Sequence, residues 1–132
     1  MSGTVFISVS DLHKKEVVSV AKLYAELGFN LVSTSGTAAV LETAGLKVQR
    51  IFKLTEGRPN ALDLLKNREI QLVINTPAGQ NPRADEVRIR TTAVYTGTPI
   101  MTTLSGARAA ALGIAALRKS GYQVKALQEY GA

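Results

Sequence analysis

The amino-acid sequence predicts an α/β fold with three layers, in which helices cover both faces of a mainly parallel, five-stranded sheet. Five short apolar runs that resemble strands alternate with segments whose apolar residues recur at helical spacing. This alternation is typical of a parallel sheet, because each strand has to return to the starting edge through a crossover helix. The chain of 132 residues is long enough for one such domain with its own core.

The first strand and the first helix are predicted within the first 28 residues. Residues 4–9 form a run rich in β-branched side chains, which ends at Ser10 and Asp11, a turn and helix-cap signal. From residue 14 to residue 27 the apolar positions follow helical spacing, and Gly28 supplies a helix stop.

A loop of hydroxyl-bearing residues joins the second strand, at residues 29–32, to a second helix at residues 38–44. This loop, residues 33–37, has the sequence Ser-Thr-Ser-Gly-Thr. Free backbone N–H groups, the positive end of the helix dipole and short side-chain donors converge at such a junction. Gly36 also lets the backbone approach a phosphate closely. The loop is therefore a candidate anion site, although an ordinary N-capped turn has the same composition.

The remaining elements continue the alternation of strands and helices. Strands are predicted at residues 46–52, 70–74 and 98–101, and helices at residues 59–67, 83–95 and 103–119. Pro59 suits the first turn of its helix, because its missing N–H would have no partner there. The segment 83–95 also has strand-like positions, and residues 75–82 form the longest loop. A final extended segment is predicted at residues 122–128.

Every loop with candidate chemistry follows a strand, so all of these loops should open on one edge of the sheet. They cover residues 10–14, 33–37, 53–58 and 75–80. In parallel α/β folds the ligand lies beyond the carboxyl ends of the strands, where the strand order reverses. In this topology Lys14 and Lys53 are the cations nearest the hydroxyl-rich loop, which favours a phosphate there.

Composition narrows the class of partner. No apolar run approaches the roughly 18 residues of a membrane span, and the chain has no cysteine for disulfides or thiolate metal sites. The net charge of +6 favours an anionic partner, yet the sixteen Lys and Arg residues are dispersed and only 5% of residues are aromatic. Nucleic-acid binding would favour clusters of both, so a small phosphorylated ligand is the better explanation. We find no signal peptide and expect a cytoplasmic location.

The sequence contains little that would support catalysis. The sole histidine, His13, could be cast as a general base, but no carboxylate in the local sequence clearly orients it, so it is interpreted as a passive residue. No His or carboxylate pair has metal-ligand spacing. Asp11, Glu56 and Asp85 lie near candidate loops but make no acid/base pair. The Gly-rich phosphate loops of dinucleotide and nucleoside triphosphate enzymes are absent. We therefore predict no catalytic residue, no metal and no cofactor.

Short motifs spread from about residue 4 to residue 129 resemble the methylglyoxal-synthase-like domain family. The motifs are Ile7-Ser8-Val9-Ser10, Ser33-Thr34-Ser35-Gly36-Thr37-Ala38, Glu56-Gly57-Arg58-Pro59, Val73-Ile74-Asn75-Thr76 and Thr102-Thr103-Leu104. The resemblance implies a Rossmann-like fold. Within the family, the chain is most similar to the carboxyl-terminal regulatory domain of the carbamoyl phosphate synthetase large subunit. On this basis residues 1–132 are interpreted as a single regulatory domain excised from a longer chain.

Two other branches of the family match less well. Methylglyoxal synthase, a phosphate-eliminating lyase, carries its catalytic aspartate in a segment that aligns with Glu56-Gly57-Arg58, and an arginine cannot take the substrate proton. The histidine expected after the fourth strand is also missing, so this lyase is kept only as the alternative function. The inosine monophosphate cyclohydrolase domain shares the opening motif but lacks Glu-Gly-Arg-Pro.

The resemblance implies an allosteric domain that binds a nucleoside monophosphate and is not itself an enzyme. Its parent is a ligase that hydrolyses glutamine and uses ATP to form carbamoyl phosphate for pyrimidine and arginine biosynthesis. The effector would be uridine monophosphate, which inhibits, or inosine monophosphate, which activates, while ornithine acts at a neighbouring site. The implied partners are the synthetase portion of the large subunit and the glutaminase small subunit; whether the domain forms a homo-oligomer is left open.

The resemblance also implies roles for individual residues. Those expected to hold the phosphate are Lys14, Thr34, Ser35, Gly36 and Thr37, and those expected around the ribose and base are Lys53, Asn75, Thr76, Asp85 and Ile89. Thr102 would contact a second effector. Two positions depart from the family: Pro77 replaces a threonine, which removes a hydroxyl and a backbone donor, and Ile100 replaces a tyrosine that contacts ornithine.

Overall fold

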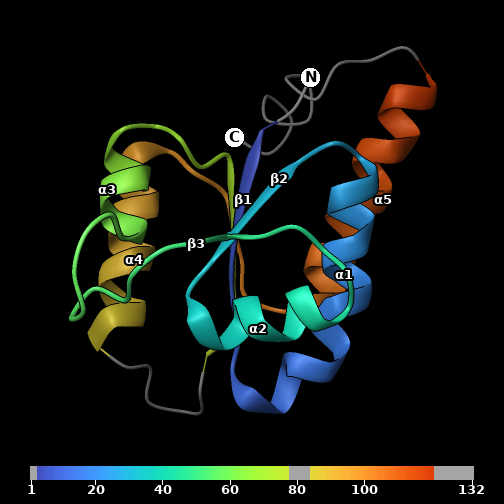
Figure 1. Cartoon of the computed structure of the whole chain (residues 1–132). Helices are drawn as coiled ribbons and strands as arrows, with labels where there is room; N and C mark the ends of the chain where they lie inside the picture. The colour runs from blue at the N-terminus through green and yellow to red at the C-terminus, as the bar shows by residue number, and fades with distance from the viewer. Residues whose placement is uncertain (1–2, 78–83, 121–132) are drawn as a thin grey trace.

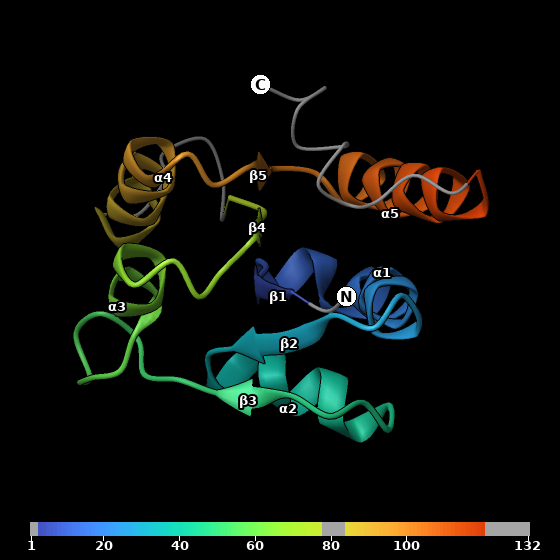
Figure 2. The same ribbon diagram turned by 90° about the horizontal axis from the view of Figure 1, so that it is seen from above.

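A computed structural model describes residues 3–77 and 84–120 of the chain. In these residues five strands form one sheet in the order β3-β2-β1-β4-β5, and every neighbouring pair is parallel (Figures 1 and 2). The strands are β1 (Thr4–Ser8), β2 (Asn30–Ser33), β3 (Gln49–Arg50), β4 (Leu72–Asn75) and β5 (Ile100–Met101). The predicted parallel α/β architecture is confirmed.

Helices cover both faces of the sheet, as Figure 2 shows from above. The helices α1 (Lys14–Glu26), α2 (Ser35–Thr43) and α5 (Leu104–Lys119) contribute to one apolar cluster, and α3 (Ala61–Lys66) and α4 (Ala84–Thr96) contribute to the other. A short 3-10 helix, η1 (Asp11–His13), precedes α1. Among the described residues, no helix is both long enough and apolar enough to span a bilayer.

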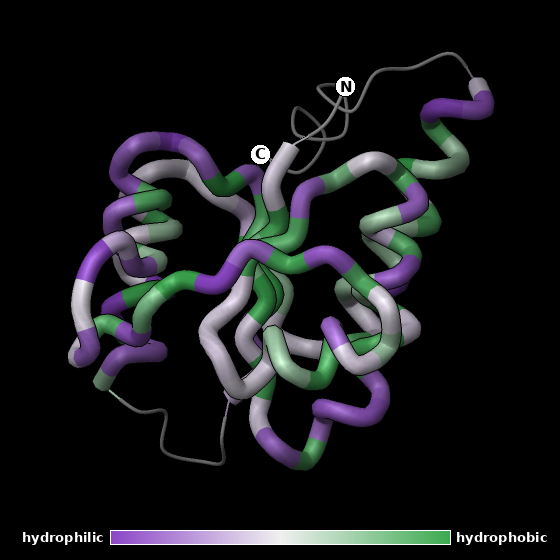
Figure 3. The backbone as a smooth tube through the Cα atoms, in the orientation of Figure 1, coloured by the Kyte–Doolittle hydropathy of each residue, from purple (hydrophilic) through white to green (hydrophobic). Residues whose placement is uncertain are grey.

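The sequence of β1 explains how one strand serves both layers. Val5 and Ile7 are buried in the α1/α2/α5 cluster, whereas Phe6 between them is buried in the α3/α4 cluster. Side chains of a strand alternate between the two faces of a sheet, so a strand covered on both faces has to be apolar throughout. The central strands are accordingly hydrophobic in Figure 3, while hydrophilic residues gather on the outer helices and loops.

The strand order fixes where the chain changes direction across the sheet. From β1 the chain moves outward through β2 to β3, and it then returns to place β4 on the other side of β1. Ser8 at the end of β1 lies in register with Asn75 at the end of β4. The strand order therefore reverses between β1 and β4, the position at which parallel α/β sheets bind ligands beyond the strand ends. This carboxyl edge lies towards the bottom of Figure 1.

Two of the predicted boundaries are wrong near the hydroxyl-rich loop. The second helix begins at Ser35 and not at residue 38, because Thr34 has an extended backbone and acts as the N-cap. The third strand covers only Gln49 and Arg50 and not residues 46–52, because only these two residues pair with β2. The predicted helix at residues 83–95 is confirmed as α4.

The start of α3 also differs from the prediction. Pro59 does not begin this helix: its peptide bond with Arg58 is cis, and the helix starts at Ala61 after Asn60, whose side chain caps it. The Asn60 side chain accepts hydrogen bonds from two N–H groups of the first turn, so Asn60 is the N-cap and the helix begins one residue after it. Pro59 therefore lies before the cap and not in the first turn. The extended segment predicted at residues 122–128 lies outside the described residues.

Candidate anion site

The loops that follow β1 and β4 are joined to each other at the carboxyl edge. The backbone N–H of Ser10 donates to the Thr76 hydroxyl at 3.0 Å, and the N–H of Thr76 donates to the carbonyl of Ser8 at 3.2 Å. Thr76 is only 2% exposed. The sequence predicted Thr76 at this edge, and in the structure its hydroxyl accepts a hydrogen bond from the neighbouring loop.

The start of α2 is tied to the same edge by two buried hydroxyl groups. The Ser33 hydroxyl donates to the carbonyl of Ile7 at 2.7 Å, and the N–H of Val9 donates to the Thr37 hydroxyl at 3.5 Å. Both hydroxyl-bearing residues are buried. The bonds fix the first turn of α2 against the end of β1.

The N-terminus of α2 presents uncapped backbone donors. The first four N–H groups of an α-helix have no partner within the helix, and the side chain of the N-cap, Thr34, makes no capping hydrogen bond. The first intrahelical bond runs from the N–H of Ala38 to the carbonyl of Thr34. The N–H groups of Ser35, Gly36 and Thr37 are therefore directed out of the helix, where the helix dipole favours an anion.

Lys14 lies against this helix end. A Cβ atom placed on Gly36 would lie 3.4 Å from the Lys14 Nζ and 3.9 Å from its Cε. The ammonium also pairs with the exposed carboxylate of Asp11. A cation beside the positive end of a helix dipole is unfavourable unless negative charge lies near both, and Asp11 supplies part of that charge. An anion between Lys14 and the N–H groups of α2 would be stabilised by all of them.

His13 belongs to this site, although the sequence indicated a passive residue. Its Nδ1 lies 2.8 Å from the Ser10 hydroxyl and 3.2 Å from the Thr76 hydroxyl. No carboxylate in the local sequence clearly oriented the ring, and the structure shows that two hydroxyl groups orient it. Thr76 is 63 residues away in the chain, so local sequence gave no signal of this contact.

Asn75 supplies a buried donor at the end of β4. The residue is 1% exposed, and its Nδ2 has no hydrogen-bond partner among the described residues. Leaving a buried polar group without a partner costs about 1–3 kcal/mol. A ligand that accepts from this amide would remove that cost, which favours the predicted role of Asn75 in binding.

The other predicted site residues are more dispersed. Lys53 is exposed in a turn after β3, where its N–H donates to the Glu56 carboxylate at 2.9 Å. Asp85 is half-buried in the first turn of α4, and Ile89 is buried in the α3/α4 apolar cluster. Thr102 is exposed directly after β5. No hydrogen bond or ion pair among the described residues joins these four to Lys14 or to the start of α2.

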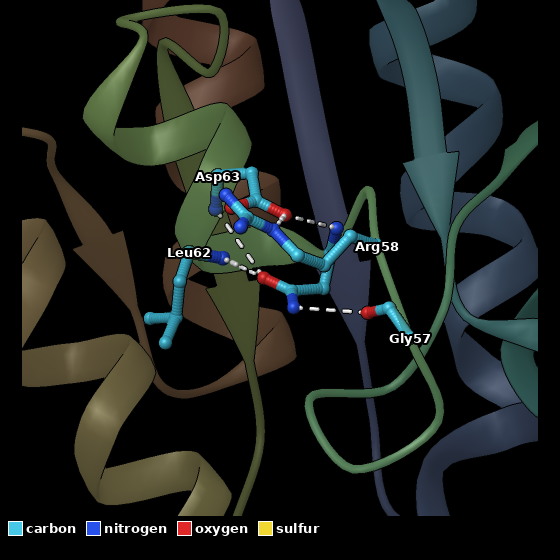
Figure 4. Close-up of polar contacts among 5 residues, drawn as sticks. Gly57, Arg58, Leu62 and Asp63 are labelled. Carbon is cyan, nitrogen blue, oxygen red and sulfur yellow. Dashed lines mark hydrogen bonds and ion pairs between the residues drawn. The ribbon is translucent and has the colours of Figure 1, made fainter.

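The Glu-Gly-Arg-Pro motif leads directly into Asn60, the N-cap of α3, and Gly57 and Arg58 hydrogen-bond to the capping residues (Figure 4). The Asn60 side chain accepts from the N–H groups of Leu62 and Asp63 and donates to the carbonyl of Gly57. The Arg58 guanidinium donates to the Asp63 carboxylate at 2.6 Å and 3.0 Å. These bonds, together with the N–H of Asn60, lower the pKa of the Asp63 carboxyl. The Arg58 side chain therefore binds a cap carboxylate and is not a proton acceptor.

The chain matches a family model described as the MGS-like domain over residues 16–102. It therefore belongs to the MGS-like domain family. Among the described residues there is no group of three or more side chains that could hold a metal ion.

Its relatives among curated proteins are large chains of carbamoyl phosphate synthase. The chain is 50% identical to the one from Acidobacterium capsulatum and 46% identical to the one from Rhodopirellula baltica, in each case over 96% of its own length and 12% of the relative's. It is 41% identical to the arginine-specific, chloroplastic large chain of Oryza sativa subsp. japonica, over 98% of its own length and 11% of the relative's. The chain thus corresponds to the MGS-like part of such a large chain and spans about an eighth of it.

A solved structure confirms the fold. The crystal structure of methylglyoxal synthase from Elizabethkingia anophelis NUHP1 superposes with a TM-score of 0.68 at 19% identity, covering 80% of this chain and 74% of the other. At this identity the likeness shows the fold alone. The predicted methylglyoxal-synthase-like architecture is therefore confirmed.

Proposed function

We propose that the chain is a regulatory domain that binds the phosphate group of a nucleoside monophosphate at the carboxyl edge of the sheet. The observation that carries this proposal is the position of Lys14, whose ammonium lies against Gly36 at the uncapped N-terminus of α2. A cation and several free N–H groups directed at one place favour a compact anion. Uridine monophosphate and inosine monophosphate are the proposed effectors, as the family resemblance implies.

The residues divide by the part of the nucleotide that each is proposed to contact. Those proposed to contact the phosphate are Lys14, Thr34, Ser35, Gly36 and Thr37. Asn75 and Thr76 are proposed to contact the ribose or base, and the unpaired Nδ2 of Asn75 supports this role. Lys53, Asp85 and Ile89 are assigned to the ribose and base by the family resemblance. Their positions agree with this, because Lys53 follows β3 and the other two lie in α4, which follows β4.

The named relatives suggest how binding would be used. Because they are large chains of carbamoyl phosphate synthase and this chain spans 12% of the first two, we propose that the domain regulates the synthetase portion of such a chain. Allosteric coupling between sites is typically worth about 1–3 kcal/mol. The isolated domain would show binding without turnover. Thr102, exposed after β5, is the proposed contact of a second effector such as ornithine.

Calorimetric titration with uridine monophosphate, inosine monophosphate and uridine tests the proposal. Binding of a monophosphate without binding of the nucleoside would place the phosphate at the centre of recognition. No heat from any of the three, with the domain shown to be folded by circular dichroism, would overturn the proposal.

Two variants test the assigned residues. Lys14→Ala and Thr34→Ala should each weaken binding of the monophosphate while leaving the thermal unfolding transition nearly unchanged. Thr43→Ala is the matched control, because the Thr43 hydroxyl lies at the other end of α2 and donates only to the carbonyl of Ala39. Equal affinity in Lys14→Ala or Thr34→Ala and the parent chain would show that the phosphate assignment is wrong.

An activity assay with dihydroxyacetone phosphate separates this proposal from the lyase alternative. Arg58 stands where the lyase has its catalytic aspartate, and its guanidinium is engaged by Asp63 (Figure 4). We expect no release of inorganic phosphate above that of the buffer. Turnover by the purified domain would instead identify it as an enzyme.

A further inference from the structure

We propose that His13 is a second, proton-dependent cation of the anion site, held in place by the hydroxyl groups of Ser10 and Thr76. Under this proposal the imidazole takes up a proton when an anion binds, and the site binds anions more tightly as the pH falls. The inference rests on the proposed function, because it concerns how the same site is regulated.

The position of the ring is fixed from two sides of the sheet edge. Ser10 lies in the loop after β1 and Thr76 in the loop after β4, and the Nδ1 of His13 is within hydrogen-bond distance of both hydroxyl groups. The N–H of Ser10 also donates to the Thr76 hydroxyl at 3.0 Å. His13 therefore connects the two loops that flank the reversal of strand order.

The hydroxyl groups of Ser10 and Thr76 can hydrogen-bond to the imidazole in both of its protonation states. When Nδ1 carries no proton, it accepts from the Ser10 or Thr76 hydroxyl, each of which has one hydrogen to donate. When Nδ1 is protonated it becomes a donor, and both hydroxyl oxygens keep a lone pair with which to accept. The imidazole can therefore gain charge without losing its hydrogen bonds to these two hydroxyl groups.

The same loop is attached to both parts of the proposed phosphate site. His13 directly precedes Lys14, whose Nζ lies beside Gly36. Ser10 directly follows Val9, whose N–H donates to Thr37 in the first turn of α2. The loop that carries the imidazole is thus joined to the first turn of α2, and an anion bound there would favour the charged form of the ring, because an opposite charge nearby favours the charged form of a titrating group.

The other charged groups at this edge do not already provide the same response. On the loops and first helical turns of this edge that the structure describes, they are Asp11, Lys14, Lys15, Glu16, Lys53, Glu56, Arg58, Asp85 and Glu86. Lys14 and Asp11, which lie on either side of His13 in the chain, pair with each other. Lysine, arginine and carboxylate side chains ordinarily keep their charge between pH 5.5 and 8, the interval in which an imidazole changes its own.

The test uses the fact that the chain contains a single histidine. The ring C–H signals of His13 can be followed by NMR from pH 5.5 to 8 without ambiguity, first alone and then with saturating uridine monophosphate. We expect the midpoint of the titration to move to higher pH by about half a unit or more with the nucleotide, because binding and protonation are linked reciprocally. An unchanged midpoint with bound nucleotide would overturn the inference and leave the proposed function standing.

The variant His13→Gln provides the second readout. Glutamine keeps a polar side chain but stays neutral, so protonation of residue 13 cannot raise the variant's affinity for uridine monophosphate as the pH falls. The ratio of the parent chain's affinity to that of the variant should rise by about two- to threefold from pH 8 to pH 6, because a half-unit shift is worth about threefold at its limit. The nucleotide phosphate also titrates in this range, but the ratio of the two affinities at each pH cancels its effect. A ratio that does not change with pH would contradict the proposal, and no binding by either protein at any pH would contradict the proposed function itself.

Discussion

Replacing Gly36 by alanine should separate the stability of the domain from its affinity for an anion. Gly36 is exposed in the first turn of α2, and its φ is not in the left-handed region. The added Cβ would lie 3.4 Å from the Lys14 Nζ, which is the end of a flexible side chain. The methyl group therefore displaces Lys14 slightly and fills the space between its ammonium and the helix N-terminus. The fold has no need of that space, but a bound phosphate does.

The expected effects have opposite signs. Alanine is favoured over glycine within a helix by about 0.8–1 kcal/mol, and the gain is smaller in a first turn, so we expect a rise in Tm of a few degrees at most. Loss of the close approach should weaken binding of uridine monophosphate more than tenfold, equivalent to about 1.4 kcal/mol. A variant that is at least as stable and binds more weakly cannot owe its weak binding to unfolding.

Gly113→Ala is the matched control for this experiment. Gly113 lies within α5, and a Cβ placed on it would meet no atom within 4 Å. Its alanine variant should gain helix stability in the same way and bind the nucleotide like the parent chain. Thermal unfolding and calorimetric titration of both variants complete the test. Should Gly36→Ala bind as tightly as Gly113→Ala, the phosphate does not lie between Lys14 and α2, and the site has been placed wrongly.

Three further predictions concern the stability of the fold. The hydrogen bond from Arg58 lowers the pKa of Asp63 in the folded state. The ionised carboxylate therefore stabilises the fold fully when the pH is above the ordinary pKa of an aspartate, and this stabilisation is lost as the pH falls through the lowered pKa of the folded state. In urea unfolding, Asp63→Asn should destabilise the domain clearly at pH 7 and less at pH 3, and an equal loss at both would contradict this. Burial raises the pKa of Tyr24 to about 12 from 10.0, so the parent chain should lose stability above pH 10 that Tyr24→Phe does not lose. At pH 7 the same variant should be about 1 kcal/mol less stable, because the Tyr24 hydroxyl donates to the carbonyl of Ala107 at 2.6 Å. Finally, Thr103→Ala should lower stability by about 1 kcal/mol, since the Thr103 hydroxyl accepts from the N–H of Gly106 at the start of α5; an unchanged Tm would show that this cap contributes nothing.

The fold was predictable because its strands and helices differ in local pattern. β1 is apolar at every interior position, and the apolar residues of α1 recur at helical spacing, so both could be found without knowledge of their partners. Boundaries depend on less local effects. Ser35 and Gly36 are poor helix formers, and they are helical because the extended Thr34 starts the helix before them. The run at residues 46–52 looked like a longer strand, but only Gln49 and Arg50 pair with β2.

The site was predictable as a set of loops but not as a set of contacts. Parallel strands place all their carboxyl ends at one edge, so the sequence was sufficient to bring Lys14, Thr37 and Asn75 to the same side of the molecule. The strand order decides which loops touch, and the local sequence of a strand does not show which other strand it pairs with. Because β4 lies directly beside β1, Thr76 reaches the loop of His13 across 63 positions of the chain. The ring thereby gains hydroxyl partners that suit it both with and without a proton, which a search for a neighbouring carboxylate would not find.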